Sequence, residues 1–209
     1  MALELVKFVL GPLQNNAFIL ADPETREAAL VDPPFGTEAI KKVLDQKDWQ
    51  LKAIWLTHAH FDHFGGAGIA AKFGPSMTIG IHPLDLPLWR DGGGAKKFGF
   101  AIQPGAEPKF FFADNQILSL GKSQIEVRHA PGHSPGHVLF YISELSTALV
   151  GDVVFLHGVG RTDLPGGSEK TLYHSISTKV FTLPDYTRIF PGHGEETTVQ
   201  EEKRWHGIL

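Results

Sequence analysis

The seven residues from Thr57 to His63 place three histidines and one aspartate directly after the short apolar run at 53–56. Imidazole nitrogens and carboxylate oxygens are ligands that zinc and iron use in proteins. Four such ligands are too many for one tetrahedral ion that also keeps an open position. The spacing therefore indicates two ions that share this turn. A histidine-rich surface turn is the alternative, but four ligand-type residues at one strand end argue against it.

The composition limits which chemistry this chain can use. It has 209 residues, 42% of them hydrophobic and 20% charged, which is typical of a globular protein and predicts a single domain over 1–209. It contains no cysteine, so any transition-metal site must use histidine and carboxylate ligands. The net charge of −4 and the lack of a Lys/Arg cluster disfavour nucleic acid as a partner.

The hydropathy pattern predicts neither secretion nor membrane insertion. The first residues lack the basic and apolar segments of a signal peptide. No apolar run approaches the length of about 18 residues that a membrane span needs. We therefore expect a cytoplasmic protein without a membrane partner.

Short apolar segments bounded by glycine, proline and asparagine predict many strands. These strands are expected at 5–10, 17–20, 28–31, 53–56, 77–81, 116–120, 125–128, 138–142, 148–150 and 188–190. Three helices are also predicted: one capped by Thr37, one over 67–73, and one capped by Ser168. The last of these carries apolar residues at helical spacing, namely Leu172, Ile176, Val180 and Leu183.

The segment 89–108 does not fit either pattern. It contains three consecutive glycines, two lysines, two phenylalanines and two prolines. Such a composition is typical of a mobile lid near a site, and equally of a solvated excursion with no role.

Three later segments also place a ligand-type residue in a glycine-flanked turn. They are Pro131-Gly132-His133, Gly151-Asp152 and Pro191-Gly192-His193. Glycine at these positions lets the backbone approach an ion closely. Each segment alone is weak evidence, but each lies beside a predicted strand, as the opening cluster does. Together they predict that His133, Asp152 and His193 complete the site.

The four motifs in this order resemble the metallo-β-lactamase superfamily. Within it, the stretch 160–165 and the turn 11–16 resemble the short glyoxalase II-like (hydroxyacylglutathione hydrolase-like) hydrolases that lack a C-terminal helical domain. The resemblance implies an α/β (α+β) fold, a four-layer αββα sandwich with two metal ions at one edge. It implies that the first ion is bound by His58, His60 and His133, that the second is bound by Asp62, His63 and His193, and that Asp152 bridges both.

This ligand set implies metal-assisted hydrolysis. Two divalent ions lower the pKa of a shared water, and the resulting hydroxide attacks an acyl carbonyl. Asp62 and Asp152 are then the catalytic carboxylates, and no serine or cysteine nucleophile is needed. Zinc is the first expectation for the ions, with iron or manganese as alternatives. The expected substrate is a small-molecule thioester such as the glutathione derivative S-lactoylglutathione; the oligomeric state stays open.

Four further residues are candidates for supporting roles. A basic residue at the position of Arg161 contacts glutathione in the family, so Arg161 is the candidate substrate anchor; a structural ion pair with Asp163 is the alternative. Asp32 is a candidate acceptor for a ligand imidazole, and a turn-forming aspartate is its alternative. His137 is expected to be a hydrogen-bonded core histidine, and Thr57 to support the turn backbone.

Other functions of the same fold remain as alternatives. A mono-iron persulfide dioxygenase would use His58, His133 and Asp152 as a two-histidine, one-carboxylate triad, but that family carries a different turn around its last histidine. A lactonase or esterase needs the same centre and stays open. A true β-lactamase is disfavoured because those enzymes usually have cysteine or serine where this chain has Asp152. A tRNA-processing nuclease and a non-catalytic binding module are also disfavoured.

Overall fold

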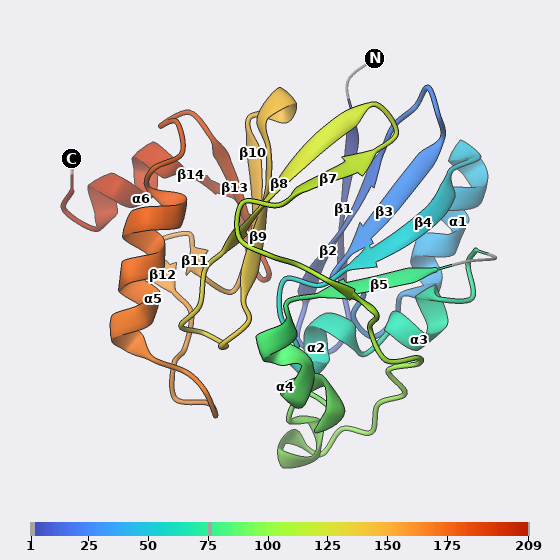
Figure 1. The fold of residues 1–209 in the computed structure, drawn as a ribbon, viewed down its shortest axis with the longest axis horizontal. Coiled ribbons are helices and arrows are strands. Elements are labelled where there is room, and N and C mark those ends of the chain that lie inside the picture. The colour runs from blue at the N-terminus through green and yellow to red at the C-terminus, as the bar shows by residue number, and fades with distance from the viewer. Residues whose placement is uncertain (1–2, 75–76, 209) are drawn as a thin grey trace.

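The computed structural model describes residues 3–74 and 77–208 and arranges them as two six-stranded sheets packed face to face (Figure 1). The expected single domain over 1–209 includes positions 1, 2, 75, 76 and 209, which lie outside the described residues. The first sheet has, in spatial order, β1 (Glu4–Leu10), β2 (Asn15–Ala21), β3 (Glu27–Val31), β4 (Gln50–Trp55), β5 (Thr78–Ile81) and β6 (Phe110–Phe111). The second has, in spatial order, β14 (Thr197–Thr198), β13 (Arg188–Pro191), β10 (Thr147–Gly151), β9 (Val138–Ile142), β8 (Ser123–His129) and β7 (Ile117–Leu120).

Helices cover the outer face of each sheet. The first sheet is flanked by α1 (Glu38–Lys47), α2 (Phe61–Phe64), α3 (Ala67–Ala70) and α4 (Leu86–Arg90). The second is flanked by α5 (Glu169–Ser175) and α6 (Val199–Trp205). Figure 1 shows α1 and α3 on one side of the molecule and α5 and α6 on the other, with both sheets between them. The predicted four-layer αββα sandwich is therefore confirmed.

The apolar residues form three layers of core that match this architecture. The central layer lies between the sheets, where Phe18 meets Phe190 at 5.8 Å and Trp55 meets Phe140 at 5.6 Å between ring centroids. The outer layers lie between each sheet and its helices. Strand β2 is buried along its whole length because both faces of its sheet are covered. This explains why it reads as a continuous apolar run.

Most predicted elements are present with shifted ends, and three helix predictions need correction. The helix expected over 67–73 is shorter and ends at Ala70. Thr37 occupies the cap position of α1, but its hydroxyl donates to the Pro34 carbonyl and does not cap the helix. Ser168 does cap α5, which then continues as a π-helix over Ile176–Val180. The widened turn keeps Leu172, Ile176 and Val180 on one buried face.

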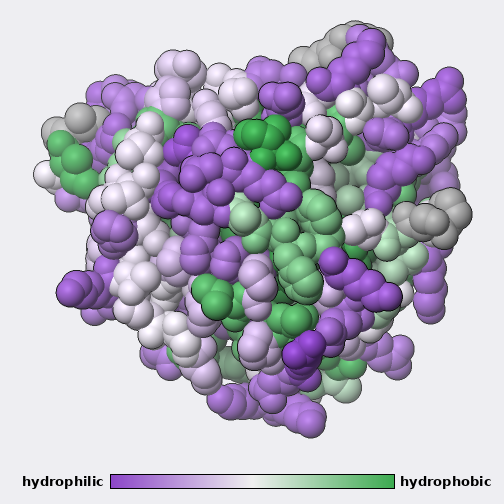
Figure 2. Space-filling model, viewed as in Figure 1, coloured by the Kyte–Doolittle hydropathy of each residue, from purple (hydrophilic) through white to green (hydrophobic). Residues whose placement is uncertain are grey.

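Several short elements were not predicted. They are α2, α4, α6, β6, β14 and the hairpin of β11 (Val154–Phe155) and β12 (Gly158–Val159). Each is short and held by contacts with distant segments, so local periodicity gives little signal. In the described part of the chain, no helix is long and apolar enough to cross a membrane. Figure 2 shows hydrophobic residues near the middle of one face, surrounded by mostly hydrophilic flanks.

Candidate metal centre

The ends of several strands meet at one edge of the sandwich and bring the predicted ligands together. Strand β4 leads into the turn of His58 and His60, and α2 then carries Asp62 and His63. Asp152 follows β10, and His193 follows β13, which is parallel to β10. An isolated bridge between Asn15 and His193 joins this edge to the start of β2. Ligand residues that are far apart in the sequence therefore lie side by side.

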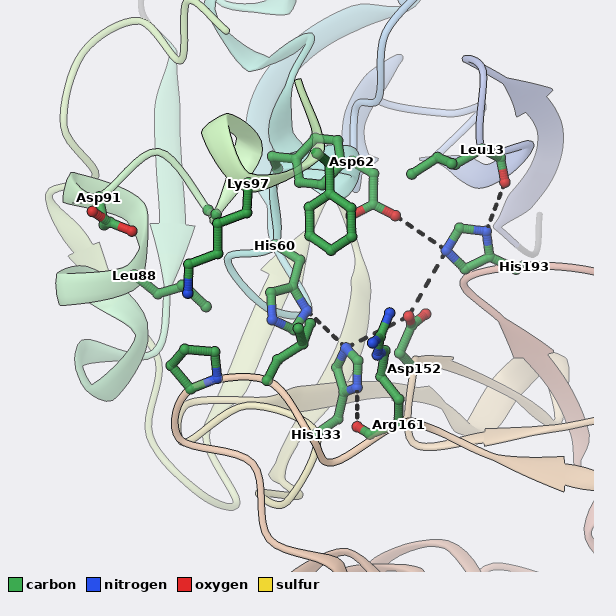
Figure 3. Close-up of a pocket in the computed structure, with 16 residues that line it drawn as sticks. Leu13, His60, Asp62, Leu88, Asp91, Lys97, His133, Asp152, Arg161 and His193 are labelled. Carbon is green, nitrogen blue, oxygen red and sulfur yellow. Dashed lines mark hydrogen bonds and ion pairs between the residues drawn. The ribbon is translucent and has the colours of Figure 1, made fainter. Parts of the chain in front are cut away.

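All seven predicted ligands fall within three overlapping groups that could hold an ion. The groups are His58–His60–His133, His58–His63–Asp152 and Asp62–His63–His193, with candidate ligand atoms within 4.8 Å of one another in each. The first and third are the two triads that the family resemblance assigned to separate ions. Asp152 lies between them in Figure 3, with dashed contacts to His133 and to His193.

The spacing between these atoms suits metal binding. Asp152 Oδ1 is 3.4 Å from His63 Nε2, and Asp152 Oδ2 is 3.6 Å from His133 Nε2 and 3.8 Å from His193 Nε2. Asp62 Oδ2 is 3.3 Å from His193 Nε2. Ligands about 2.0–2.1 Å from a tetrahedral zinc lie about 3.3 Å from one another. Ions therefore fit between these atoms with only small adjustments.

Unpartnered buried atoms mark the same positions. His58 Nε2, His63 Nε2 and Asp152 Oδ1 are among the buried side-chain atoms of the described chain that have no hydrogen-bond partner. An unsatisfied buried polar atom costs about 1–3 kcal/mol. Three such atoms facing one space are explained if that space holds cations.

Hydrogen bonds fix which nitrogen most of the histidines offer. His133 Nδ1 donates to the Arg161 carbonyl at 2.8 Å, and His193 Nδ1 donates to the Leu13 carbonyl at 3.0 Å. His63 Nδ1 faces the Asp32 carboxylate at 3.1 Å. A carbonyl or carboxylate oxygen only accepts, so Nδ1 carries the proton in all three. In the neutral form of each ring, the Nε2 lone pair is therefore the one available to an ion.

The His60–His133 contact has a different form. His60 Nδ1 lies 2.8 Å from His133 Nε2 (Figure 3). In the tautomer of His133 that donates from Nδ1, its Nε2 accepts the hydrogen bond from His60 Nδ1. An ion bound to both nitrogens would take the place of this proton.

Burial and charge set the protonation of the centre. Burial lowers the pKa of His58 well below 6.5 and, with a neighbouring imidazole, lowers that of His60 to about 3. Burial opposes ionisation of Asp62, but His63 and other contacts lower its pKa to about 2. Burial also opposes the charge on His63, yet the carboxylates of Asp152 and Asp62 raise its pKa well above 6.5. At neutral pH the carboxylates are ionised and His58 and His60 are neutral, as metal ligands must be.

Asp32 lies behind the ligand turn and organises it. Its carboxylate accepts from Thr57 N at 2.7 Å, from Thr57 Oγ1 at 2.6 Å and from His63 Nδ1 at 3.1 Å. Because the Thr57 hydroxyl proton is used on Asp32, its oxygen accepts from His58 Nδ1 at 3.0 Å. One buried carboxylate thereby orients two candidate ligands.

Asp152 is held by its own surroundings. Its backbone N–H donates to His137 Nε2 at 3.0 Å, and His137 is fully buried and stacks on His58 at 4.7 Å. A Cβ added at Gly192 would lie 2.2 Å from Asp152 Oδ1 and 2.6 Å from His63 Cε1. The turn before His193 therefore requires glycine for close packing against the centre.

Two polar residues of the centre were missed by sequence reasoning. Asp85 is fully buried and accepts from Ala59 N at 2.9 Å, Ser134 Oγ at 2.7 Å and Gly136 N at 2.5 Å. It therefore ties the turn that carries His58 and His60 to the turn that carries His133. Nothing in its sequence context marks it.

Asn15 is the second missed residue. Its amide donates to Asp62 Oδ2 at 2.8 Å and lies 3.3 Å from His193 Nε2. The Asn15-Asn16 turn was visible in the sequence, but only as part of the family resemblance.

Arg161 has two separate contacts. Its carbonyl orients His133, while its guanidinium makes a bidentate pair with Asp163, with both N–O distances 2.7 Å. The alternative ion pair is therefore present in the structure. The side chain still lines the cavity over the centre, so contact with a substrate remains a prediction.

A cavity of about 340 Å³ opens onto the candidate ligands. His60, Asp62, His133, Asp152 and His193 form its floor. Its walls are largely apolar and come from Leu13, Phe61, Leu88, Phe98, Leu164 and Pro165, with Lys97, Arg161 and Asp91 as the charged wall residues. Such a pocket suits a small substrate whose reacting group meets the polar floor.

Comparison with known proteins agrees with this geometry. The family model described as "Metallo-beta-lactamase superfamily" matches residues 10–193. Hydroxyacylglutathione hydrolase GloC of Haemophilus influenzae is 37% identical over 199 residues, covering 94% of this chain and 93% of that protein. Human mitochondrial persulfide dioxygenase ETHE1 is 33% identical over 192 residues, covering 89% of this chain and 68% of its own.

A solved structure bears on the metal. The di-iron-bound form of TTHA1623 superimposes with a TM-score of 0.87 at 36% identity, covering 98% of this chain and 100% of that one. A protein of this fold and similar sequence therefore holds two iron ions, which supports divalent metals at the His/Asp groups described above.

Proposed function

The chain belongs to the metallo-beta-lactamase superfamily, and from that premise we propose that it is a two-ion metallohydrolase that cleaves acyl thioesters. The observation that carries this proposal is the pair of complete ligand triads with Asp152 between them. S-lactoylglutathione is the first candidate substrate, supported by the likeness to the GloC protein.

The candidate ligands would form two sets, one for each ion. His58, His60 and His133 would hold one ion, Asp62, His63 and His193 the other, and Asp152 would contact both. When bound, two divalent ions supply an activated water and positive charge for the developing oxyanion. The ligand set of nitrogen and oxygen atoms accepts zinc, iron or manganese, and we propose zinc first.

The chain itself supplies orientation and exclusion of water. Asp32 and Thr57 hold His58 and His63 in one tautomer, and His137 holds the Asp152 backbone. The apolar cavity wall would hold the apolar part of the substrate, with the acyl carbonyl over the polar floor. Fixed groups of this kind need little reorganisation during the reaction.

A persulfide dioxygenase is the second candidate, favoured by the likeness to ETHE1. It would need only His58, His133 and Asp152 around one iron. That assignment gives no role to Asp62, His63 and His193, although their ligand atoms are gathered equally closely. The hydrolase therefore accounts for more of the site.

Parallel assays on the purified protein test the proposal. We expect thiol release from S-lactoylglutathione that is lost on chelation and restored by zinc, with no oxygen uptake on glutathione persulfide. Oxygen uptake at one iron per chain, or turnover of a lactone or β-lactam without thioester cleavage, would overturn it.

A further inference from the structure

The segment 89–108 is anchored on the candidate metal centre along its inner side. Phe61, which lies between His60 and Asp62, donates its N–H to the Gly93 carbonyl at 3.1 Å. Trp89 stacks on Phe64 at 4.3 Å. Gly93 has φ +62°, and a Cβ there would lie 2.4 Å from Phe61 N. The start of the segment is thus packed directly on the ligand turn.

Phe98 is the outer member of an aromatic cluster on this segment. Phe61 stacks on Phe100 at 5.1 Å, and Phe100 stacks on Phe35 at 5.6 Å, between ring centroids. These two contacts hold the segment in place without Phe98. Phe98 stacks on Phe61 at 5.5 Å but remains 46% exposed and lines the cavity. An exposed aromatic face beside a polar floor is stabilised when the apolar part of a ligand covers it.

Lys97 differs from the other cation of the cavity. The Arg161 guanidinium is engaged by Asp163 through two nitrogens. Among the described residues, no ion pair or side-chain hydrogen bond involves Lys97, and no dashed contact reaches it in Figure 3. Lys97 extends along the wall beside Leu88 in that view. It is therefore the cation free to pair with a ligand carboxylate.

We infer that Lys97 and Phe98 form the specificity subsite of this centre, which takes acyl thioesters carrying both an apolar group and a carboxylate. The apolar group would be covered by Phe98 and by Leu13 and Leu164, which also line the cavity, and the carboxylate would pair with Lys97. This inference rests on the proposed hydrolase function and names the substrate class of the same site. It assigns recognition to segment 89–108, whereas the sequence assigned it to Arg161.

Binding of thioethers to the zinc-loaded protein, measured by calorimetry, tests the subsite without turnover. S-hexylglutathione has the apolar chain and the carboxylates, S-methylglutathione lacks the chain, and the dimethyl ester of S-hexylglutathione lacks the negative charges of the carboxylates. We expect the wild type to bind the hexyl acid at least about tenfold more tightly than the methyl acid, because the chain leaves water. Phe98→Ala should reduce this ratio below about threefold, and Phe98→Leu should keep most of it.

The charge is tested with a neighbouring lysine as control. Lys97→Ala should weaken binding of the hexyl acid by about threefold to fivefold, more at low salt than at high salt, and leave the diester unchanged. Lys96→Ala should change neither, because Lys96 lines a different pocket.

Three results would overturn the inference: equal affinity of the wild type for the hexyl and methyl acids, equal effects of Lys97→Ala and Lys96→Ala, or no binding of any probe. Loss of thioester hydrolysis with retained probe binding would instead count against the proposed function alone. The two failures are therefore distinguishable.

Discussion

The two sides of the cavity are built in opposite ways. Directly behind the floor, His58, His63 and Asp32 are buried, and hydrogen bonds from Thr57 and between these groups fix several of their side-chain atoms. On the wall, Lys97 and Phe98 are exposed. Reactive groups need fixed geometry, whereas substrate contacts form only when the substrate arrives.

The difference between floor and wall predicts which property of the protein a substitution should change. A change on the floor disturbs metal binding and every substrate equally. A change on the wall alters the choice between substrates and leaves the ions in place. The largest effects are therefore expected at the floor and the smallest at the wall.

Asp152→Ala should cause the largest loss. The variant removes the only carboxylate that contacts both candidate ion sites among the described residues. Turnover should fall by at least about a thousandfold, together with metal content. Steady-state kinetics and elemental analysis measure both. Near-wild-type turnover would refute the assignment of Asp152 between the ions.

Asp85→Asn should weaken metal binding although Asp85 is not itself a candidate ligand. Asp85 accepts three hydrogen bonds, and none of the donors, Ala59 N, Ser134 Oγ and Gly136 N, is a ligand side chain. An amide nitrogen in its place would face a donor, so metal affinity at the His58–His60–His133 group should fall about tenfold to a hundredfold. Unfolding free energy should fall by about 2–4 kcal/mol. Competition titration with a chelator and denaturant unfolding measure these effects.

The control for this variant is Asp45→Asn, an exposed aspartate paired with Lys41 on α1. In the competition titration with a chelator, this variant should bind metal with the affinity of the wild type. If Asp85→Asn binds two ions with unchanged affinity, its role is confined to folding.

The metal-free protein should lose stability as the pH falls from about 6.5 towards 3. The pKa of His60 is about 3 in the folded protein, and those of His58 and His137 are also lowered by burial. Between about pH 6.5 and 3, the unfolded chain therefore binds protons that the folded chain does not bind. The raised pKa of His63 contributes stability that is fully present below 6.5, so it does not reverse the trend. Melting temperatures of chelator-treated protein check this, and a flat profile would contradict it.

Arg161→Ala should have the smallest effect. Its guanidinium is exposed and paired with Asp163, while its carbonyl, which orients His133, is kept in the variant. We expect KM to rise by no more than about threefold and metal content to stay at the wild-type level. A hundredfold loss would show that the guanidinium, and not segment 89–108, dominates recognition.

The sequence predicted the floor better than the wall for a physical reason. His58, Asp152 and His193 follow the ends of strands, and parallel strand ends converge on one edge, so local patterns imply a shared site. The short apolar runs predicted most of the strands, whereas the αββα sandwich was implied by the family resemblance. Sequence spacing alone predicts a shared site when the fold of the backbone brings the strand ends to the same edge of the sheets.

The positions of the other site residues depend on tertiary contacts that no local sequence pattern encodes. Asp85 reaches two turns through the packing of an irregular segment, and Arg161 acts on His133 through a carbonyl that any residue has. Segment 89–108 has an unusual composition, but only the stacking of Phe98 and Phe100 on Phe61 shows where it sits. Tertiary packing decides these positions.

The number of zinc ions bound per chain tests the central claim most directly. Metal-free wild type titrated with zinc should saturate at two ions per chain, and a His193→Ala variant should retain one tight ion at the His58–His60–His133 group. Saturation of the wild type at one ion, with His193→Ala binding identically, would contradict the two-ion centre.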